Sequence, residues 1–196
     1  MSEEQSDNRA ENIFFLEKQE VVVNHFDAGG LILDIGGGGE GIIGQLKGNQ
    51  VIAIDPNKRE LEEAANGPLK IVMDAADLKF LDNSFETVTA FFTLLYIKSK
   101  TLDKIFNEAF RVLTPGGKFL IWDADIPTRP DTEKDVVALM LTIKLPDKEI
   151  HTGYGTGWPL EEKNAADYIQ LAQDVGFDIV EKKQDDRLFY LELQKP

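Results

Sequence analysis

The sequence predicts an α/β protein built on one doubly wound, mostly parallel sheet. Short apolar runs alternate with amphipathic segments from Leu31 onward, which is the pattern of repeated βα units. A glycine-rich stretch follows the first run, and an aspartate stands at or just after the end of each of three successive runs. With 196 residues, 42% of them hydrophobic, the chain is long enough for one domain with a substantial core and short for two.

Seven apolar runs define the expected strands. Five of them are expected to form the parallel part of the sheet: 31–35, 51–54, 69–72, 87–92 and 118–122. Two closing runs, 177–180 and 188–193, flank the polar stretch 182–187 and predict an antiparallel hairpin. The expected architecture is therefore a Rossmann-like, doubly wound, mostly parallel seven-stranded sheet with a C-terminal antiparallel hairpin.

Two amphipathic helices are expected in the second half of the chain. Apolar residues recur at three- and four-residue steps over 102–113 and again over 165–175. The Thr-Pro-Gly-Gly stretch 114–117 is expected to end the first helix and Gly176 the second. Proline cannot continue the helical hydrogen-bond ladder, and glycine accepts the left-handed backbone of a helix exit.

The remaining segments are the N-terminal residues and one interruption of the βα pattern. The polar residues 1–12 are expected to be a disordered arm, and the domain itself to cover 13–196. The apolar residues of Asn12 to Phe26 are spaced well enough to pack on the sheet as a helix. Residues 125–159 break the βα rhythm, and the runs on either side of Pro146-Asp147 indicate a hairpin or an irregular insertion. We expect this insertion to cover the substrate site.

Charge and composition exclude several kinds of site. The chain has 35 acidic and 21 basic residues and a net charge of -14, which repels nucleic acid and anionic membrane surfaces, so neither is an expected partner. It has no cysteine, and His25 and His151 show no metal-ligand or triad spacing, so no metal is expected. Because no apolar run has membrane-spanning length and no secretory signal is visible, we expect a cytoplasmic protein.

The strongest motif is the stretch 31–41, in which an apolar strand containing an acid leads into a glycine loop and then a helix. Residues without a β-carbon turn sharply and let a ligand approach the backbone closely. Gly36, Gly38 and Gly41, with Asp55 about 20 residues further on, also fit the fingerprint of a dinucleotide site. The glycines alone therefore leave a nicotinamide cofactor open.

Three aspartates bear on which cofactor the glycine loop would bind. Asp34, Asp55 and Asp74 lie at or just after the ends of three successive predicted strands. Because the carboxyl ends of parallel strands meet at the edge where ligands bind, we expect all three acids in one crevice. Such a crevice favours a cationic ligand, and a carboxylate can accept hydrogen bonds from two ribose hydroxyls.

In this order the motifs resemble those of the class I S-adenosylmethionine-dependent methyltransferases, in particular the quinone-biosynthesis type. The resemblance runs from about Leu31 to Trp122, and it is carried by four stretches: 33–38, 54–57, 73–80 and 112–119. It departs from the family at Glu40, where a third glycine is common and here comes one residue later. The departure concerns the glycine loop alone, and the strand and the acids match the family's pattern.

The resemblance implies S-adenosylmethionine as the cofactor and assigns residues to it. In the family the glycine loop surrounds the methionine part, the acid matching Asp55 holds the ribose hydroxyls, and the acid matching Asp74 receives the adenine amino group. Either Phe91 or Phe92 is expected to point at the pocket. The candidate cofactor residues are Asp34, Gly36, Gly38, Asp55, Asp74, Ala75 and Phe91.

The predicted function is methyl transfer to a small-molecule acceptor, whose nucleophile attacks the methyl carbon in line. A general base is needed only if that nucleophile must lose a proton, and the weak candidates are His151, Tyr154 and Asp123. The glycine cluster 153–158 is expected to be a mobile loop at the rim of the substrate pocket. Two alternatives stay open, an NAD-dependent oxidoreductase and a non-catalytic sensor or partner protein that binds S-adenosylmethionine. Neither the acceptor nor the oligomeric state follows from the sequence.

Overall fold

The computed structural model of the chain describes residues 12–160 and 162–196. By their internal contacts these residues form two compact units. The larger contains residues 26–124 and 164–196, and the smaller contains the described residues up to His25 together with 125–163. The insertion expected from the sequence thus lies in the smaller unit with the N-terminal segment.

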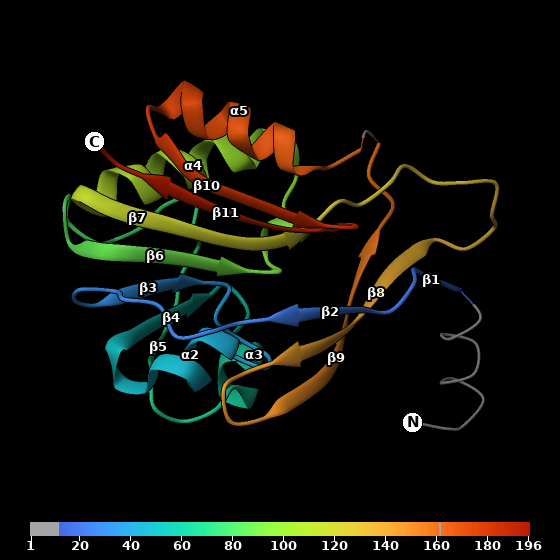
Figure 1. Ribbon diagram of the computed structural model, residues 1–196, viewed down its shortest axis with the longest axis horizontal. Coiled ribbons are helices and arrows are strands. Elements are labelled where there is room, and N and C mark those ends of the chain that lie inside the picture. The colour runs from blue at the N-terminus through green and yellow to red at the C-terminus, as the bar shows by residue number, and fades with distance from the viewer. Residues whose placement is uncertain (1–11, 161) are drawn as a thin grey trace. The chain divides into compact units, whose positions relative to one another are not determined.

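The larger unit is built on a seven-stranded sheet with the order β10-β11-β7-β6-β3-β4-β5 (Figure 1). Its strands are β3 (Ile32–Ile35), β4 (Val51–Asp55), β5 (Leu69–Val72), β6 (Phe85–Phe91), β7 (Leu113–Ala124), β10 (Asp178–Asp185) and β11 (Leu188–Gln194). The pairs from β7 to β5 are parallel, while β11 is antiparallel to both β7 and β10. The predicted seven strands and the closing antiparallel hairpin are confirmed.

The centre of this sheet is the point where the strand order reverses. β3 lies between β4, which follows it in the chain, and β6, which the chain reaches only after β5. In open α/β sheets ligands bind beside the carboxyl ends of the strands at such a switch point. The loops after β3, β4 and β6 therefore surround the position where a ligand is expected.

The helices of the larger unit are α2 (Ile42–Lys47), α3 (Lys58–Glu63), α4 (Ser99–Val112) and α5 (Ala165–Val175), with short 3-10 turns η1 (Gly48–Gln50) and η2 (Leu94–Tyr96). Figure 1 shows α4 and α5 alongside β6, β7, β10 and β11, while α2 and α3 lie near β4 and β5. One buried cluster joins α4 and α5 to the sheet through Phe106, Tyr168 and Phe119. Both amphipathic helices predicted from the sequence are present.

The first helix ends directly before the predicted stretch, but that stretch does not form the expected helix exit. α4 ends at Val112, and residues 114–117 belong to β7 rather than to a helix stop. The backbone of the preceding loop satisfies the last helical carbonyls, because Asn83 N–H donates to Arg111 O and Ser84 N–H to Val112 O. The glycines of β7 pair with the C-terminus instead, where Gly116 N–H donates to Lys195 O. The second prediction holds, since α5 ends at Gly176 with φ 109°.

The smaller unit is a four-stranded sheet made of β1 (Ile13–Phe15), β2 (Gln19–Val22), β8 (Val136–Lys144) and β9 (Glu149–Gly157). β1 and β2 both pair with β8 in parallel, and β9 pairs with β8 as an antiparallel hairpin. The hairpin around Pro146-Asp147 is therefore confirmed. The chain enters and leaves the insertion side by side, because Ile126 and Lys163 exchange backbone hydrogen bonds of 2.9 and 3.2 Å.

The N-terminal segment and the glycine cluster 153–158 differ from their predicted structures. The helix expected over Asn12 to Phe26 is wrong, because the segment pairs with β8, a partner distant in the sequence, and its valines fit a strand. The mobile glycine loop 153–158 is also wrong, because its glycines lie in β9 and Trp158 Nε1–H donates to Lys134 O at 2.7 Å. Of the expected disordered arm, residues 1–11 lie outside the described residues, while Asn12 is hydrogen-bonded to Asp135.

Within the described part of the chain, no helix has the length and apolar character needed to cross a membrane.

Candidate cofactor site

The glycine loop between β3 and α2 is tied to neighbouring backbone on both sides. The N–H groups of Gly36 and Gly37 donate to Ile54 O at 2.8 and 3.1 Å, which joins the loop to β4. Gly39 N–H donates to Glu60 O at 2.9 Å, which joins it to α3. The loop is thus held between the strand and the helix that follow it in the chain.

Gly36, Gly37 and Gly38 all lack room for a side chain, because a β-carbon at any of them would lie less than 3.0 Å from a neighbouring atom. Gly36 has φ 72°, and a β-carbon there would lie 2.3 Å from Thr93 Cγ2 and Oγ1. At Gly38 a β-carbon would lie 2.5 Å from Glu60 Cβ and 3.1 Å from Asp55 Oδ2. The loop therefore packs directly against the turn after β6, against α3 and against Asp55.

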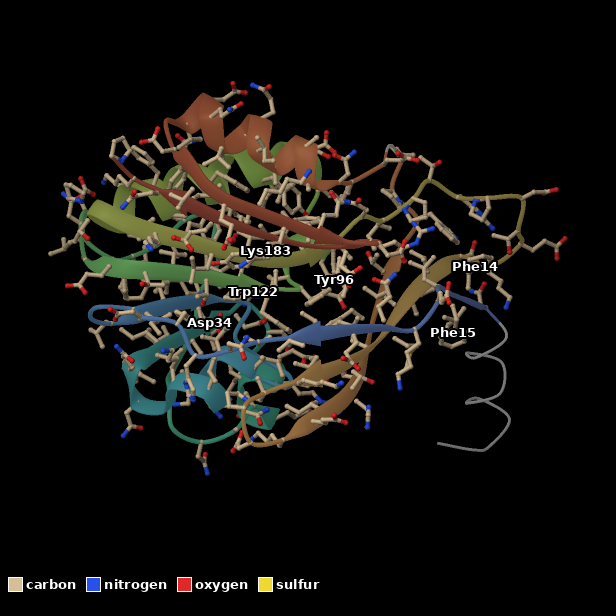
Figure 2. All side chains as sticks on the ribbon, in the orientation of Figure 1. Phe14, Phe15, Asp34, Tyr96, Trp122 and Lys183 are labelled. Atoms are coloured by element: carbon tan, nitrogen blue, oxygen red, sulfur yellow. The ribbon has the colours of Figure 1, made fainter. Side chains whose placement is uncertain are left out.

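Asp34 lies inside β3 (Figure 2). Its side chain is 2% exposed, and Thr89 Oγ1 donates to Asp34 Oδ1 at 2.7 Å. Burial raises the pKa of the Asp34 carboxyl to about 7, and the Thr89 hydrogen bond opposes the rise. A β-carbon at Gly37 would lie 2.6 Å from Asp34 Oδ2, so this carboxyl packs under the loop backbone. Its role as a cofactor contact stays a prediction.

Asp55 is the last residue of β4 and faces Gly38 of the loop. Its Oδ1 accepts Asn57 N–H at 2.7 Å, and Asn57 in turn caps α3 by accepting Arg59 N–H at 3.1 Å. Burial raises the pKa of the half-buried Asp55 carboxyl. Within the described residues Asp55 Oδ2 accepts no hydrogen bond, so an oxygen remains for the hydroxyl donors of a ribose.

Asp74 lies two residues beyond β5 and is exposed, whereas its neighbour Ala75 is buried. Asp74 Oδ1 accepts Ala76 N–H at 2.9 Å, which closes a tight turn. Met73 N–H donates to Asp55 O at 3.2 Å, so the backbone just before Asp74 is joined to the end of β4. The structure thus brings together the glycine loop, Asp55 and the beginning of the 74–84 loop.

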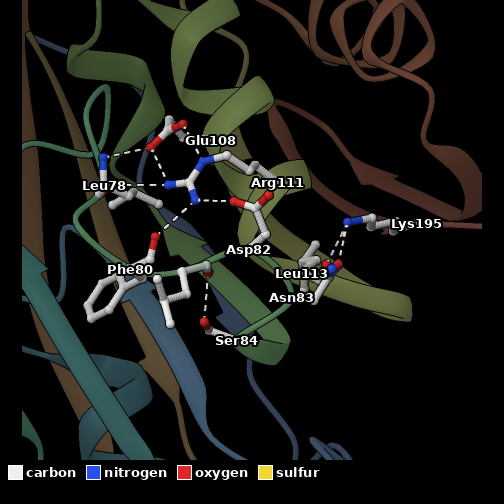
Figure 3. Close-up of polar contacts among 10 residues, drawn as sticks. Leu78, Phe80, Asp82, Asn83, Ser84, Glu108, Arg111, Leu113 and Lys195 are labelled. Atoms are coloured by element: carbon white, nitrogen blue, oxygen red, sulfur yellow. Dashed lines mark hydrogen bonds and ion pairs between the residues drawn. The ribbon is translucent and has the colours of Figure 1, made fainter.

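Arg111 of α4 holds the 74–84 loop in place (Figure 3). Its guanidinium donates to the carbonyl oxygens of Phe80 and Leu78 at 2.9 and 3.0 Å and to Asp82 at 2.7 Å. It also forms two hydrogen bonds of 2.8 Å with Glu108, whose pKa these contacts lower. Glu108 completes the arrangement by accepting Leu78 N–H at 2.7 Å.

The aromatic candidates lie at the end of β6. Phe91 is 7% exposed and contacts Phe92 and Trp122 at ring-centroid distances of 4.9 and 6.0 Å. Because side chains alternate along a strand, Phe91 shares a sheet face with Thr89 and Asp34, which are register partners. That is the face on which Asp34 supports the glycine loop, so Phe91 remains the candidate.

The catalytic candidates are divided between the two units. Asp123 lies at the end of β7 in the larger unit and is fully buried. His151 and Tyr154 both lie on β9 in the smaller unit, three residues apart and therefore on opposite faces of the strand. His151 Nδ1 is 3.1 Å from Thr142 Oγ1, and His25 is exposed, though it lies in no helix.

Sequence reasoning missed three residues that shape the loop. Glu60 could have been found, because Asn57 followed three residues later by a glutamate is a capping-box pattern at a helix start. Thr89 and Thr93 gave no such signal. Their contacts with Asp34 and Gly36 arise only when β6 pairs beside β3.

Part of the chain is similar to known methyltransferases. The methyltransferase domain family matches residues 33–121. A sterol 4-C-methyltransferase of Caenorhabditis elegans is 34% identical over 48% of this chain and 28% of its own length. A ubiquinone/menaquinone biosynthesis C-methyltransferase of Pseudomonas putida is 34% identical over 52% of this chain and 44% of its own. The chain thus spans less than half the length of both curated relatives.

Among solved structures, the phosphoethanolamine N-methyltransferase 2 of Haemonchus contortus in complex with S-adenosylmethionine aligns with a TM-score of 0.61. It is 20% identical, and the alignment covers 88% of this chain and 50% of that one, so it bears on the fold alone. The larger unit thus has the Rossmann-like fold found in solved structures of S-adenosylmethionine-dependent methyltransferases. Residues 33–121 are similar to the methyltransferase domain family.

Proposed function

We propose that the chain is an S-adenosylmethionine-dependent methyltransferase that transfers the methyl group to a carbon atom of a small-molecule acceptor. The observation that carries the proposal is the environment of the Asp55 carboxylate. It is a half-buried carboxylate beside Gly38, with Oδ2 available to hydroxyl donors. The match of residues 33–121 to the methyltransferase domain family supports the cofactor. The names of the two curated relatives, both C-methyltransferases, support a carbon nucleophile on a sterol-like or quinone-like acceptor.

The proposed cofactor contacts follow the edge of the sheet. Asp55 would accept the two ribose hydroxyls, and Asp74 with the Ala75 N–H would receive the adenine. Gly36 and Gly38 would let the loop backbone lie next to the methionine part, and a side chain at either position would collide with its protein neighbours. Asp34 and Phe91 would border the same region. The net charge of -14 favours a cationic cofactor and disfavours a nucleic-acid acceptor.

When bound, S-adenosylmethionine supplies an electrophilic methyl group, which an acceptor nucleophile takes as the neutral thioether leaves. The chain's own contribution would be alignment and the exclusion of water, which in well-oriented systems is worth on the order of 7 kcal/mol or more. A base is required only for an acceptor that must lose a proton. His151 and Tyr154 stay candidates for that task, and the expectation that residues 125–159 cover the acceptor stays a prediction.

The test begins with calorimetric titration of the full chain with S-adenosylmethionine, S-adenosylhomocysteine and NAD. We expect both adenosyl ligands to bind, and we expect Asp55→Ala to lose most of that affinity. Asp103→Ala, which removes an exposed carboxylate on α4, is the matched control and should bind like the wild type. Binding of NAD alone would contradict the proposal and favour an oxidoreductase.

Turnover is tested separately. S-Adenosylmethionine labelled in the methyl group would be incubated with sterol and quinone-precursor acceptors. We expect a product whose labelled methyl group is bonded to a carbon atom of the acceptor. Cofactor binding with no label transferred to any acceptor of either kind would support the non-catalytic alternative instead.

A further inference from the structure

The turn that follows β6 has an unusual backbone. Phe92, the first residue after the strand, has φ 47°, a left-handed conformation that is rare for a bulky side chain. Its N–H donates to Trp122 O at 2.8 Å, so pairing with β7 continues through this residue. Figure 2 shows Tyr96 just beyond the carboxyl end of β6, where the turn ends. Such strain persists only where the surroundings determine the conformation.

Asp123 contacts this turn through its carboxyl group. Its side chain is 0% exposed, and Oδ2 accepts Leu95 N–H at 3.0 Å and the Tyr168 hydroxyl at 3.3 Å. Oδ1 accepts Ala124 N–H at 2.9 Å. The carboxyl thus joins β7, α5 and η2, and a buried carboxyl with several donors fixes the groups around it.

The same turn supports the cofactor loop. Thr93 lies directly under Gly36, since a β-carbon at Gly36 would be 2.3 Å from Thr93 Cγ2 and Oγ1. The Thr93 hydroxyl donates to Phe91 O at 3.2 Å, which fixes the orientation of its side chain. A shift of the turn would therefore change the space against which Gly36 packs.

We propose that Asp123 is a positioning residue for cofactor binding, which acts through Leu95 and Thr93 on Gly36 and not as a general base. The inference rests on the proposed function, because Gly36 is one of the proposed cofactor residues. It replaces the catalytic role that the sequence left open for Asp123. Burial and the three donors argue for this replacement, because a base must reach the acceptor with an oxygen that can take a proton.

The experiment measures S-adenosylhomocysteine affinity by calorimetry, and exchange of the Leu95 amide by hydrogen–deuterium exchange. Asp123→Ala removes the acceptor, so we expect affinity to fall about tenfold or more and the Leu95 amide to lose protection. Asp123→Asn keeps an oxygen for Leu95 N–H and should stay within about threefold of the wild type. Tyr168→Phe removes only one of the donors to Asp123 and should lower affinity less than Asp123→Ala is expected to. It takes the place of Asp123→Ala if that variant does not fold.

Two further variants locate the effect. Thr93→Ala should lower affinity while Leu95 keeps its protection, because it leaves the Asp123 contacts intact and removes only the packing against Gly36 and the hydrogen bond to Phe91 O. Phe177→Leu is the control for general destabilisation. Phe177 packs against Phe110 and Phe119 in the core, so this variant should lower the melting temperature and leave affinity unchanged.

The outcomes separate this inference from the proposed function. A general base would leave S-adenosylhomocysteine affinity unchanged in all Asp123 variants, and that result would overturn the inference. Equal affinity losses in Phe177→Leu and Asp123→Ala would also overturn it, because the effect would then be unspecific. A wild-type chain that does not bind S-adenosylhomocysteine would overturn the proposed function and the inference with it.

Discussion

Replacing Arg111 by alanine should destabilise the larger unit more than any ordinary surface substitution. The guanidinium forms five hydrogen bonds, two with Glu108, one with Asp82 and two with the backbone carbonyls of Leu78 and Phe80 (Figure 3). Arg111→Ala removes all of them and leaves two loop carbonyls and the Glu108 carboxylate without their cation.

The magnitude follows from exposure. A hydrogen bond to a charged group contributes about 1.5–3 kcal/mol when buried. The Arg111 side chain is 31% exposed and Asp82 is 69% exposed, so the Asp82 ion pair adds little, while Glu108 at 20% and the two carbonyls carry most of the effect. With that discount for solvent we expect a loss of about 3 kcal/mol in the free energy of unfolding. For a chain of this size the melting temperature should fall by roughly 6–12 °C.

Urea and thermal unfolding followed by circular dichroism would measure this loss. Arg111→Lys should recover only a minor part, because an ammonium group cannot contact Glu108, Asp82 and two carbonyls at once. Arg59→Ala is the matched control. Arg59 pairs with Glu63 one turn along α3, and its side chain is 81% exposed, so its removal should leave the melting temperature nearly unchanged. A loss below about 1 kcal/mol in Arg111→Ala would refute the reasoning.

Three further predictions address single features of the larger unit. The folded-state pKa of Asp34 is raised above its unfolded value of 3.8 to about 7, so the folded state holds an extra proton between these values and stability falls as pH rises through them. The stability of Asp34→Asn relative to the wild type should therefore rise from pH 4 to pH 7, by about 4 kcal/mol at most. Urea unfolding at several pH values measures this, and a difference in free energy of unfolding that does not change with pH would contradict it. Gly36→Ala should abolish S-adenosylhomocysteine binding in calorimetry, because of its φ of 72° and the contact with Thr93, whereas Gly48→Ala, with φ 57° and no atom within 4 Å, should bind normally. Asn164→Ala removes the capping box of α5 and should cost about 1 kcal/mol in thermal unfolding; no change would mean that the cap is redundant.

Local patterns in the sequence were sufficient for the larger unit's architecture. The apolar runs, the helical periodicity of 102–113 and 165–175 and the glycine at 176 each act within a few residues, so the strands and helices they predict were found. The order of the acids along the chain also predicted their convergence, because parallel strands bring their carboxyl ends to one edge. Asp55 and the glycine loop are joined as that argument requires.

Predictions failed where pairing with a distant segment decided the local structure. The segment 12–26 has apolar residues that suit either a helix or strands, and pairing with β8 selects strands. The Thr-Pro-Gly-Gly stretch joins β7 because the C-terminus pairs with its glycines. The glycines of β9 are in a strand because β8 offers a full partner, although glycine weakens an isolated strand.

The sequence by itself determined the strands and helices of the larger unit, the glycine loop and the positions of the acids along the chain, since these depend on residue type and spacing. Only the tertiary structure decided how deeply each acid is buried and which groups donate hydrogen bonds to it. Asp34 and Asp123 are buried, Asp55 is half-buried and Asp74 is exposed, although all four lie at or near a strand end. The physical reason is that burial and hydrogen-bond partners come from neighbouring strands and helices, which contribute Thr89, Leu95 and Tyr168 from elsewhere in the chain.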